Sequence, residues 1–475
     1  MEFVNRKKEL CILDTRYESN QAEFLVVTGR RRVGKTSVLA QFARQHQGIY
    51  FLGYLDSEES LLQQFSQLIY QSEYPDSKPD DAFTYGSWLG LFRAIGRLAQ
   101  NQRLVVIIDE YPYLVGSSQR LASQLQKVWD EILQHSQIYL VICGSYISVM
   151  KRDLLDRDAP LHGRRTGQLF VQPLTVWQAA EFLPNYTPLE IVDAYAVAGG
   201  TPAYLRQLSD QRDIWDNIRY SVLNRGSMLY NEPDLLLRDE LREPRLYAAI
   251  LRAIAAGNHQ LKKIATAAGI ESSNSVSSYL DLLKSLRWVE HRVPLGSTRH
   301  EGQRWGTWHL VDAYIRFWAR YVLPHVRRLE YDEADELLYE LIRPTWAQFV
   351  GVVWEDIARQ HLPLLSKERE IPFWPEEVGS WWSAKAQIDL VGVNYADRLA
   401  VLGEARWREE KVGVRYFNEL EKKADHWLNN QSGWKLFYVF YSKRGFTDDL
   451  VSLAAQQGSI LLKTPDDVIP QQQAQ

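Results

Sequence analysis

The stretch EFLVVTGRRRVGKTSVLAQFARQ, at residues 23–45, decides how the first part of this chain folds. A short apolar run leads into a glycine-containing turn, and apolar residues at helical spacing follow it. The turn, GRRRVGKT at 29–36, has the spacing G-x-x-x-x-G-K-[ST]. In a strand-to-helix context this spacing predicts a loop that binds phosphate through backbone N–H groups. A glycine-rich turn can arise by chance, but the flanking strand and helix make that interpretation the weaker one.

The spacing of this phosphate loop assigns tasks to its residues. Gly29 and Gly34 allow the backbone to wind closely around the phosphates, and Lys35 is placed to reach the β and γ oxygens. Thr36 can coordinate Mg²⁺. We therefore expect ATP and Mg²⁺ as cofactors. The residues expected at the nucleotide are Gly29, Arg30, Arg31, Arg32, Val33, Gly34, Lys35, Thr36 and Ser37.

A second apolar strand, LVVIIDE at 104–110, ends in two carboxylates. Asp109 is expected to hold Mg²⁺ through water, and Glu110 to orient or deprotonate the water that attacks the γ-phosphate. An acidic pair at the end of a strand can also be plain solvated surface. The phosphate loop upstream favours the catalytic interpretation, because both features then point to one function.

Two further features are candidates for contact with the γ-phosphate. The strand YLVICGS at 139–145 ends in Ser145, a small polar residue at the position of a phosphate sensor. The segment HGRRT at 162–166 offers Arg164 and Arg165, either of which can neutralise charge on the transferring phosphoryl group. Basic pairs more often face solvent, so this role is the less certain of the two.

The order of apolar runs predicts the domains. Runs at 23–29, 48–52, 103–109, 137–145 and 167–174 alternate with amphipathic stretches, which is typical of a parallel sheet with helices on both faces. Helical periodicity then takes over, and strands return at 387–393, 399–407 and 435–442. We interpret the chain as an α/β phosphate-loop domain at 1–225, a helical domain at 226–330 and a second α/β domain at 331–475.

Composition limits the classes of protein that remain. Hydrophobic residues make up 45% and charged residues 24%, as in folded globular proteins. The net charge of −4 gives no overall attraction to nucleic acid, so such binding requires a local basic surface. Two distant cysteines cannot form a disulfide framework, and no apolar run reaches the length of a membrane span. We expect a cytoplasmic protein that does not bind membranes.

Several motifs together resemble the archaeal-type ATPase family of AAA-like and STAND-like NTPases. They are FVNRKKEL at 3–10, GRRRVGKT, IIDEYPYL at 107–114, CGSYISVM at 143–150 and AGGTPAYL at 198–205. The resemblance covers almost the whole chain. It implies a winged helix followed by a carboxyl-terminal domain similar to PD-(D/E)xK nucleases, which have a restriction-endonuclease-like α/β fold. It also implies that Asn5 and Arg6 lie beside the base or ribose, although both residues are equally compatible with an ordinary helix start.

The pattern between 245 and 294 reads as three helices and an extended segment, the order of a helix-turn-helix with a wing. Residues 241–300 contain nine Lys or Arg against four acids, a formal charge of +5. This predicts double-stranded DNA as a partner, although winged helices also dock proteins. The residues expected at DNA are Lys262, Lys263, Ser273, Asn274, Ser275, Ser278 and Arg292.

Carboxylates in the last domain match the nuclease resemblance in part. Asp389 lies in one strand and Glu404 ends the next, and Glu355 on a preceding helix completes a possible Mg²⁺ site. The lysine expected two residues after Glu404 is Arg406, whose permanent charge makes it a poor activator of water. Lys385, four residues before Asp389, is a substitute candidate on the strand's two-residue period. We expect weak or absent nuclease activity.

Two functions remain open. The first is an ATP-driven protein that acts on DNA through the winged helix. The second is a nucleotide-dependent switch or scaffold for partner proteins, in which the last domain is inert. A homo-oligomer is compatible with both, and the sequence does not identify a protein partner.

Overall fold

The computed structural model describes residues 4–298, 305–429 and 432–470, apart from the side chains of 147, 148 and 273. It divides into a first unit, Met1–Pro173, and a second unit, Leu174–Gln475. Residues 174–225, which the sequence analysis grouped with the phosphate loop, thus lie in the second unit. The division into three domains stays a prediction.

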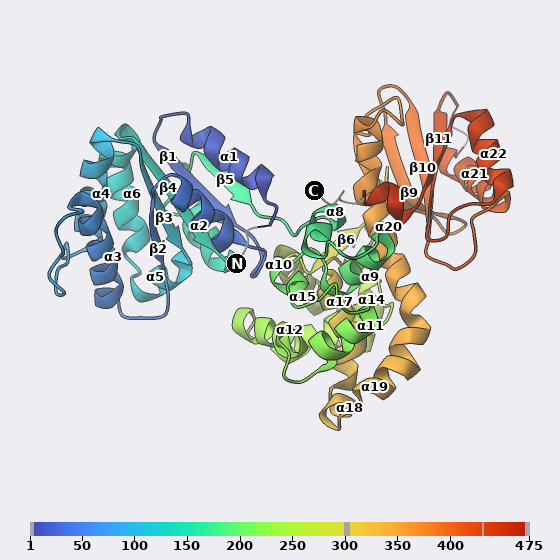
Figure 1. Cartoon of the computed structure of the whole chain (residues 1–475), viewed down its shortest axis with the longest axis horizontal. Helices are drawn as coiled ribbons and strands as arrows, with labels where there is room; N and C mark the ends of the chain where they lie inside the picture. The colour runs from blue at the N-terminus through green and yellow to red at the C-terminus, as the bar shows by residue number, and fades with distance from the viewer. Residues whose placement is uncertain (1–3, 299–304, 430–431, 471–475) are drawn as a thin grey trace. The chain divides into compact units, whose positions relative to one another are not determined.

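The first unit is built on a sheet of five parallel strands in the order β2-β3-β4-β1-β5 (Figure 1). The strands are β1 (Glu23–Thr28), β2 (Ile49–Leu52), β3 (Leu104–Asp109), β4 (Ile138–Gly144) and β5 (Gly167–Phe170). Each coincides with an apolar run of the sequence, so the predicted parallel α/β sheet is confirmed. The three central strands β3, β4 and β1 are buried along their whole length, as expected of a sheet covered on both faces.

Alternate strand residues of the first unit face two separate cores. One core packs Val26, Ile108 and Ile142 against the helices α3 to α6, and the other packs Val27, Ile107 and Val141 against α1 and α2. The helices are α1 (Lys7–Tyr17), α2 (Lys35–Gln45), α3 (Glu58–Glu73), α4 (Trp88–Asn101), α5 (Tyr111–Ser117), α6 (Leu121–Glu131) and α7 (Ile147–Met150). Because β4 lies between β1 and β3, the carboxyl ends of these strands meet at one edge.

The second unit begins with a helical region. Its helices are α8 (Val176–Ala179), α9 (Pro188–Ala198), α10 (Pro202–Leu205), α11 (Ile214–Asn217), α12 (Met228–Glu240), α13 (Pro244–Ala255), α14 (Leu261–Ala268) and α15 (Ser273–Ser285). An antiparallel hairpin follows, formed by β6 (Val289–Arg292) and β7 (Thr307–Leu310). Three helices and the strand β6 thus appear in the order predicted from residues 245–294, whereas β7 lies beyond that range. No helix within the described ranges combines the length and apolarity needed to cross a bilayer.

The rest of the second unit is a mixed sheet of five strands in the order β12-β11-β10-β9-β8. The strands are β8 (Glu377–Trp382), β9 (Gln387–Asn394), β10 (Leu399–Arg406), β11 (Lys435–Ser442) and β12 (Ile460–Lys463). The helices are α17 (Ala313–Phe317), α18 (Val326–Glu330), α19 (Ala334–Leu337), α20 (Arg343–Lys367), α21 (Val414–Leu428), α22 (Asp448–Gln457) and α23 (Pro465–Val468). The three inner strands were predicted. The two edge strands were missed for different reasons: β8 mixes polar and apolar residues, whereas β12 is apolar but only four residues long.

Candidate functional site

The phosphate loop joins the end of β1 to the start of α2, as the sequence predicts. At Gly29 an added Cβ would lie 2.6 Å from the carbonyl oxygen of Val171, so the backbone approach leaves no room for a side chain. Gly34 precedes α2 with a φ of 95°, a left-handed conformation that favours glycine. Both glycines of the motif are therefore required by the loop's geometry.

Lys35 is buried, and its side chain turns back onto its own loop. Its Nζ donates hydrogen bonds to the carbonyl oxygens of Gly29, at 2.9 Å, and Arg30, at 2.8 Å. A buried ammonium needs such acceptors. Phosphate oxygens are stronger acceptors because they are charged. The phosphate oxygens of a bound nucleotide can therefore replace these carbonyl oxygens as acceptors for Lys35 Nζ.

Asp109 is fully buried at the end of β3 and gathers donors from three elements. Thr36 Oγ1 and Tyr50 Oη both donate to its Oδ2, at 2.7 and 2.6 Å, and the Glu110 N–H donates to Oδ1 at 2.9 Å. Burial and the neighbouring Asp109 carboxylate raise the pKa of the Tyr50 hydroxyl, so Tyr50 acts as a neutral donor. The predicted metal-binding residues Thr36 and Asp109 are thus in direct contact. Tyr50 was not identified from the sequence.

Glu110 follows Asp109 in a left-handed conformation with a φ of 51°. Its Oε1 accepts a hydrogen bond from Ser145 Oγ at 3.0 Å. Its Oε2 is buried and has no hydrogen-bond partner within the described part of the chain. Strained backbone and an unsatisfied buried oxygen are both costly, and they are found mostly where function requires them. The structure brings the predicted water-activating carboxylate and the predicted phosphate sensor together.

This contact predicts the effect of Ser145→Ala. Without the hydroxyl, Glu110 loses the only side-chain donor that the described residues give it, and we expect kcat for ATP hydrolysis to fall about tenfold, since a hydrogen bond to a charged group contributes about 1.5–3 kcal/mol. KM for ATP should change little. Steady-state kinetics test this, with Ser136→Ala, at a buried serine that donates to Leu133 O, as the matched control. An unchanged kcat in Ser145→Ala would show that Ser145 does not position Glu110.

The three loop arginines differ in their surroundings. Arg30 is buried, whereas Arg32 is exposed and has a left-handed φ of 65°. The Arg31 guanidinium lies 4.7 Å from the centre of the Tyr146 ring and donates a hydrogen bond to its hydroxyl. Arg31 is therefore anchored to Tyr146, the residue after Ser145 at the end of β4.

The side chain of Arg6 contacts a backbone carbonyl of the phosphate loop. Its guanidinium donates to the carbonyl oxygens of Val33, at 2.5 Å, and Gln172, at 2.8 Å, and it pairs with Glu9 at 2.7 Å. The Asn5 Oδ1 accepts from the Arg6 N–H at 2.6 Å. Burial lowers the pKa of Arg6 despite the Glu9 charge. Arg6 thus holds the start of α1 against the loop, and its predicted place beside the base or ribose stays a prediction.

Arg164 and Arg165 are not brought to the nucleotide. Arg164 pairs with Asp130 at 3.0 Å, and Arg165 donates to Leu154 O at 3.2 Å. The next residue, Thr166, bonds to Phe24 near the start of β1, whereas the phosphate loop follows the end of that strand. These arginines therefore lie at the opposite edge of the sheet. Because β5 runs parallel to β1, the segment that leads into β5 lies at the amino ends of the strands, away from the phosphate loop.

The predicted DNA-binding residues of the second unit divide into two groups. Exposed side chains are found at the start of α14 and on one face of α15, namely Lys262, Lys263, Asn274, Ser275 and Ser278. The opposite face of α15 is buried through Val276, Leu280 and Leu283. Neither lysine forms an ion pair with another described residue. The side chain of Ser273, the first residue of α15, lies outside the described structure.

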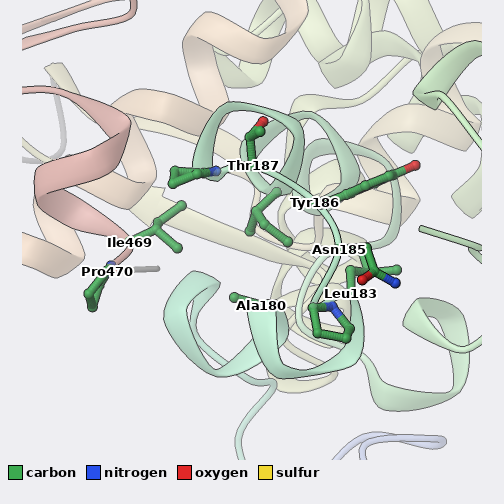
Figure 2. A pocket seen from close by; sticks show the side chains of 10 residues that line it. Ala180, Leu183, Asn185, Tyr186, Thr187, Ile469 and Pro470 are labelled. Carbon is green, nitrogen blue, oxygen red and sulfur yellow. The ribbon is translucent and has the colours of Figure 1, made fainter. Parts of the chain in front are cut away.

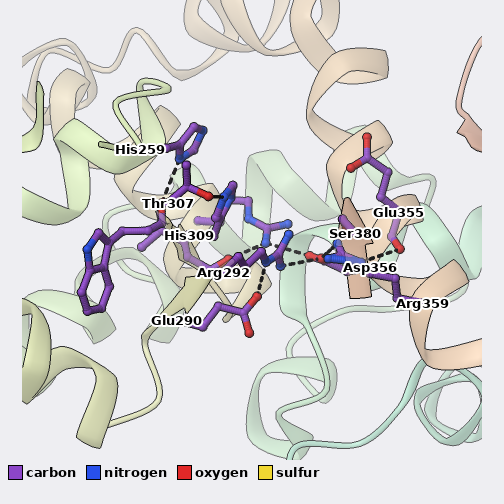
Figure 3. A network of polar contacts seen from close by, with 12 residues as sticks. His259, Glu290, Arg292, Thr307, His309, Glu355, Asp356, Arg359 and Ser380 are labelled. Atoms are coloured by element: carbon purple, nitrogen blue, oxygen red, sulfur yellow. Dashed lines mark hydrogen bonds and ion pairs between the residues drawn. The ribbon is translucent and has the colours of Figure 1, made fainter. Parts of the chain in front are cut away.

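Arg292 was predicted to bind DNA phosphate, but its side chain is paired with carboxylates of the protein (Figure 3). Its guanidinium pairs with Glu290 and, at 2.8 Å, with Asp356 of α20. Arg316, at 2.9 Å, and Arg359 pair with the same Asp356 carboxylate. Burial opposes ionisation of Asp356, but the surrounding arginines, Arg292 above all, lower its pKa. The Arg292 charge is therefore used inside the protein, where it ties the hairpin to α20.

Asp389 and Glu404 of the last sheet and Glu355 of α20 lie close enough to influence one another. Burial, and then the Asp389 charge, raise the pKa of Glu355 to about 8 and that of Glu404 to about 7. Arg406 pairs with Glu404 and approaches Asp389 Oδ2 at 3.9 Å. Lys423 of α21, which the sequence analysis overlooked, pairs with Glu404 Oε1 at 2.6 Å.

Lys385 does not take the predicted place beside Asp389. It is exposed in the turn before β9, where the Ser383 N–H bonds to Ala386 O, and its own N–H bonds to Ser383 Oγ. The two-residue strand period does not extend into a turn, so it cannot align Lys385 with Asp389. In the described structure no ion pair links these two residues.

A partly open pocket of the second unit is lined by none of the predicted site residues (Figure 2). It has a volume of about 240 Å³ and is lined mainly by the loop from Leu183 to Pro188 together with Ile469 and Pro470. Its described lining contains no carboxylate, amine or imidazole. The described lining of the pocket therefore offers hydroxyl and amide groups but no charged group for phosphate or a metal ion.

Comparisons with known proteins agree with the geometry of the first unit. Residues 3–208 match a family described as an ATPase domain predominantly from Archaea, and residues 318–422 match archaeal and bacterial proteins of unknown function. An uncharacterised protein of Methanocaldococcus jannaschii is 32% identical over 444 residues, 93% of this chain and 96% of that protein. An uncharacterised ATP-binding protein of the same organism is 48% identical over 40 residues, 8% of this chain and 68% of that protein.

Two solved structures also resemble the chain, more distantly. The Aeropyrum pernix ORC2 protein, in its ADPNP–ADP complexes, is 14% identical with a TM-score of 0.41, over 70% of this chain and 96% of that one. A STAND protein from Pyrococcus horikoshii with a tetratricopeptide repeat sensor is 15% identical with a TM-score of 0.30, over 77% of this chain and 50% of that one. Similarity at this level supports no inference about function.

Proposed function

Because the chain belongs to the family defined by an ATPase domain predominantly from Archaea, we propose that its first unit binds ATP with Mg²⁺ and hydrolyses it. The observation that carries this proposal is the meeting of the phosphate loop, the Thr36–Asp109 contact and Glu110 at one edge of the sheet. Lys35 would then exchange its loop carbonyls for phosphate oxygens.

The residues at this edge fit Mg²⁺. Thr36 Oγ1 and Asp109 Oδ2 are oxygen donors 2.7 Å apart, and Mg²⁺ prefers oxygen ligands. Bound with ATP, Mg²⁺ neutralises charge on the β- and γ-phosphates. Thr36 would turn its hydroxyl from Asp109 towards the ion, while Tyr50 continues to donate to Asp109 and keeps that carboxylate oriented.

Glu110 is our candidate for the group that orients or deprotonates the attacking water. Its Oε2 has no partner among the described residues and can accept a hydrogen bond from water, while Ser145 fixes Oε1. The carboxylate is thus held at one oxygen and available at the other. The ATPase assay on Glu110→Gln that opens the Discussion tests this assignment.

For the second unit we propose DNA binding through a winged helix made of α13 to α15 and the β6–β7 hairpin. Support comes from exposed Lys262 and Lys263 and from the exposed polar face of α15. ATP hydrolysis in the first unit would then serve an action on DNA held by the second. Without Arg292, the predicted contacts are fewer, and the two lysines carry more of the expected affinity.

We expect the double substitution Lys262→Glu and Lys263→Glu to weaken duplex DNA binding across sequences. Each lysine that neutralises a phosphate releases counterions, so the slope of log affinity against log salt should become shallower by about 2. Fluorescence anisotropy over a salt series measures both quantities. The control is Lys7→Glu with Lys8→Glu, an exposed pair on α1 with the same change in charge. Equal affinity and slope in native and variant chains would favour protein docking.

The alternative is a nucleotide-dependent switch or scaffold for partner proteins. This alternative is favoured because Arg406 and Lys423 pair with both carboxylate oxygens of Glu404 in the second unit, as expected of an inert last domain. The two functions differ in whether DNA changes ATP turnover. Stimulation by duplex DNA is expected only if the chain acts on DNA.

A further inference from the structure

The resemblance to PD-(D/E)xK nucleases implies a divalent cation between Asp389 and Glu404. In those enzymes the carboxylates face a site that is open to the ion, and a nearby lysine assists the water. Whether this chain fits such an ion depends on what the carboxylate oxygens already contact.

The oxygens of Glu404 are both taken by cations of the protein. Arg406 pairs with Oε2 and Lys423 pairs with Oε1 at 2.6 Å. The Arg406 guanidinium also stands 3.9 Å from Asp389 Oδ2, so one side chain faces both carboxylates. The Glu404 and Asp389 side chains are only 3% and 8% exposed. Within the described residues no group of three His, Cys, Asp or Glu is arranged to hold a metal.

We propose that Arg406 and Lys423 stand in for the divalent cation, so that the native chain binds neither Mg²⁺ nor Mn²⁺ at Asp389 and Glu404. Arg406 supplies a planar, permanently charged group that faces both carboxylates. Lys423 supplies the amine from α21 instead of from β10. The carboxylates are then a fixed ionic cluster of the fold.

The balance of charge supports this assignment. The two buried carboxylates Asp389 and Glu404 face two cations, Arg406 and Lys423. Carboxylates in this proximity disfavour one another's ionised form unless cations offset the repulsion. Removing Arg406 leaves one cation, Lys423, for these two carboxylates. An added divalent ion would then have both the charge and the space to enter.

Manganese binding tests the proposal directly. The full chain, free of nucleotide so that the phosphate loop holds no metal complex, is titrated with MnCl₂ while electron paramagnetic resonance reports the free ion. The native chain should show no site that depends on Asp389. Arg406→Ala should gain one site, and Asp389→Asn in the same background should remove it.

Thermal unfolding provides a second readout. Arg406→Ala should lower Tm by about 5 °C, because it breaks an ion pair that is mostly buried, and MnCl₂ should recover much of the loss. Native Tm should not respond to Mn²⁺. The matched control is Arg444→Ala, which removes an exposed arginine paired with Glu409 and should create no manganese site. Should Arg406→Ala fail to fold, Arg406→Gln keeps the size of the side chain without its charge.

The outcomes are distinct. A manganese site in the native chain that Asp389→Asn abolishes overturns the proposal, and so does a folded Arg406→Ala or Arg406→Gln that binds no Mn²⁺. A site gained on removing Arg406 supports it. Because ATP takes no part in the measurement, none of these results depends on the proposed ATPase activity.

Discussion

Glu110→Gln is expected to lower kcat for ATP hydrolysis by about 10²–10⁴-fold, the usual contribution of a positioned general base. The amide keeps the size of the side chain and can still accept from Ser145, but it cannot take a proton from water. ATP affinity should remain close to native, because Glu110 does not belong to the phosphate loop. Phosphate release measured alongside equilibrium binding of a fluorescent ATP analogue separates the two effects.

Lys35→Ala is expected to impair a different step, because Lys35 binds the phosphates of ATP, whereas Glu110 acts on the attacking water. We expect the Kd for ATP to rise by roughly a hundredfold, since charged hydrogen bonds contribute about 1.5–3 kcal/mol each. A Glu110→Gln chain that hydrolyses ATP at the native rate would remove Glu110 from the mechanism. Native affinity in Lys35→Ala would remove the phosphate loop as the binding site.

Asp356→Ala is expected to destabilise the second unit by about 3–5 kcal/mol, the cost of removing one partner from a buried ionic group. Arg292, Arg316 and Arg359 all pair with this carboxylate, and the substitution leaves three neighbouring guanidinium groups without it. Unfolding by denaturant, followed through the tryptophan fluorescence of the second unit, measures the loss.

The matched control for Asp356 is Asp335→Ala. Asp335 pairs with Arg219 in the same unit, but both side chains are more than 40% exposed, and exposed pairs contribute about 0–1 kcal/mol. A similar small loss in both variants would contradict the view that Asp356 is the centre of a stabilising network. Asp356→Asn, which keeps an acceptor oxygen without the charge, should fall between the two.

The nucleotide site was largely predictable because its signals are local. The phosphate loop lies within one strand–turn–helix stretch, and Asp109 is the last residue of a fully buried strand. Parallel strands place their carboxyl ends at one edge, so the contact between Thr36 and Asp109 follows from the fold class. Tyr50 was missed because its strand reads as simply apolar, and its partner lies 59 residues away.

The second unit was harder to predict because its decisive contacts are non-local. Arg292 looked like a free cation on a basic segment, yet its partner Asp356 follows 64 residues later. Lys423 lies on an amphipathic helix where a lysine usually faces solvent, 19 residues after the glutamate that it pairs with. A motif defined by its spacing along one strand, such as Glu404 and Arg406 on β10, includes only the residues of that strand. Cations supplied by a neighbouring helix can be recognised only once the packing is known.

The most direct test of the proposed function is the rate of ATP hydrolysis by the full chain, measured with Mg²⁺ over a series of duplex DNA concentrations. We predict hydrolysis that rises with DNA to a plateau, and a rise that is weakened by Lys262→Glu with Lys263→Glu. In Glu110→Gln we predict hydrolysis lowered by about 10²–10⁴-fold at every DNA concentration. A native rate that stays the same with and without saturating DNA would contradict action on DNA and favour the nucleotide-dependent switch.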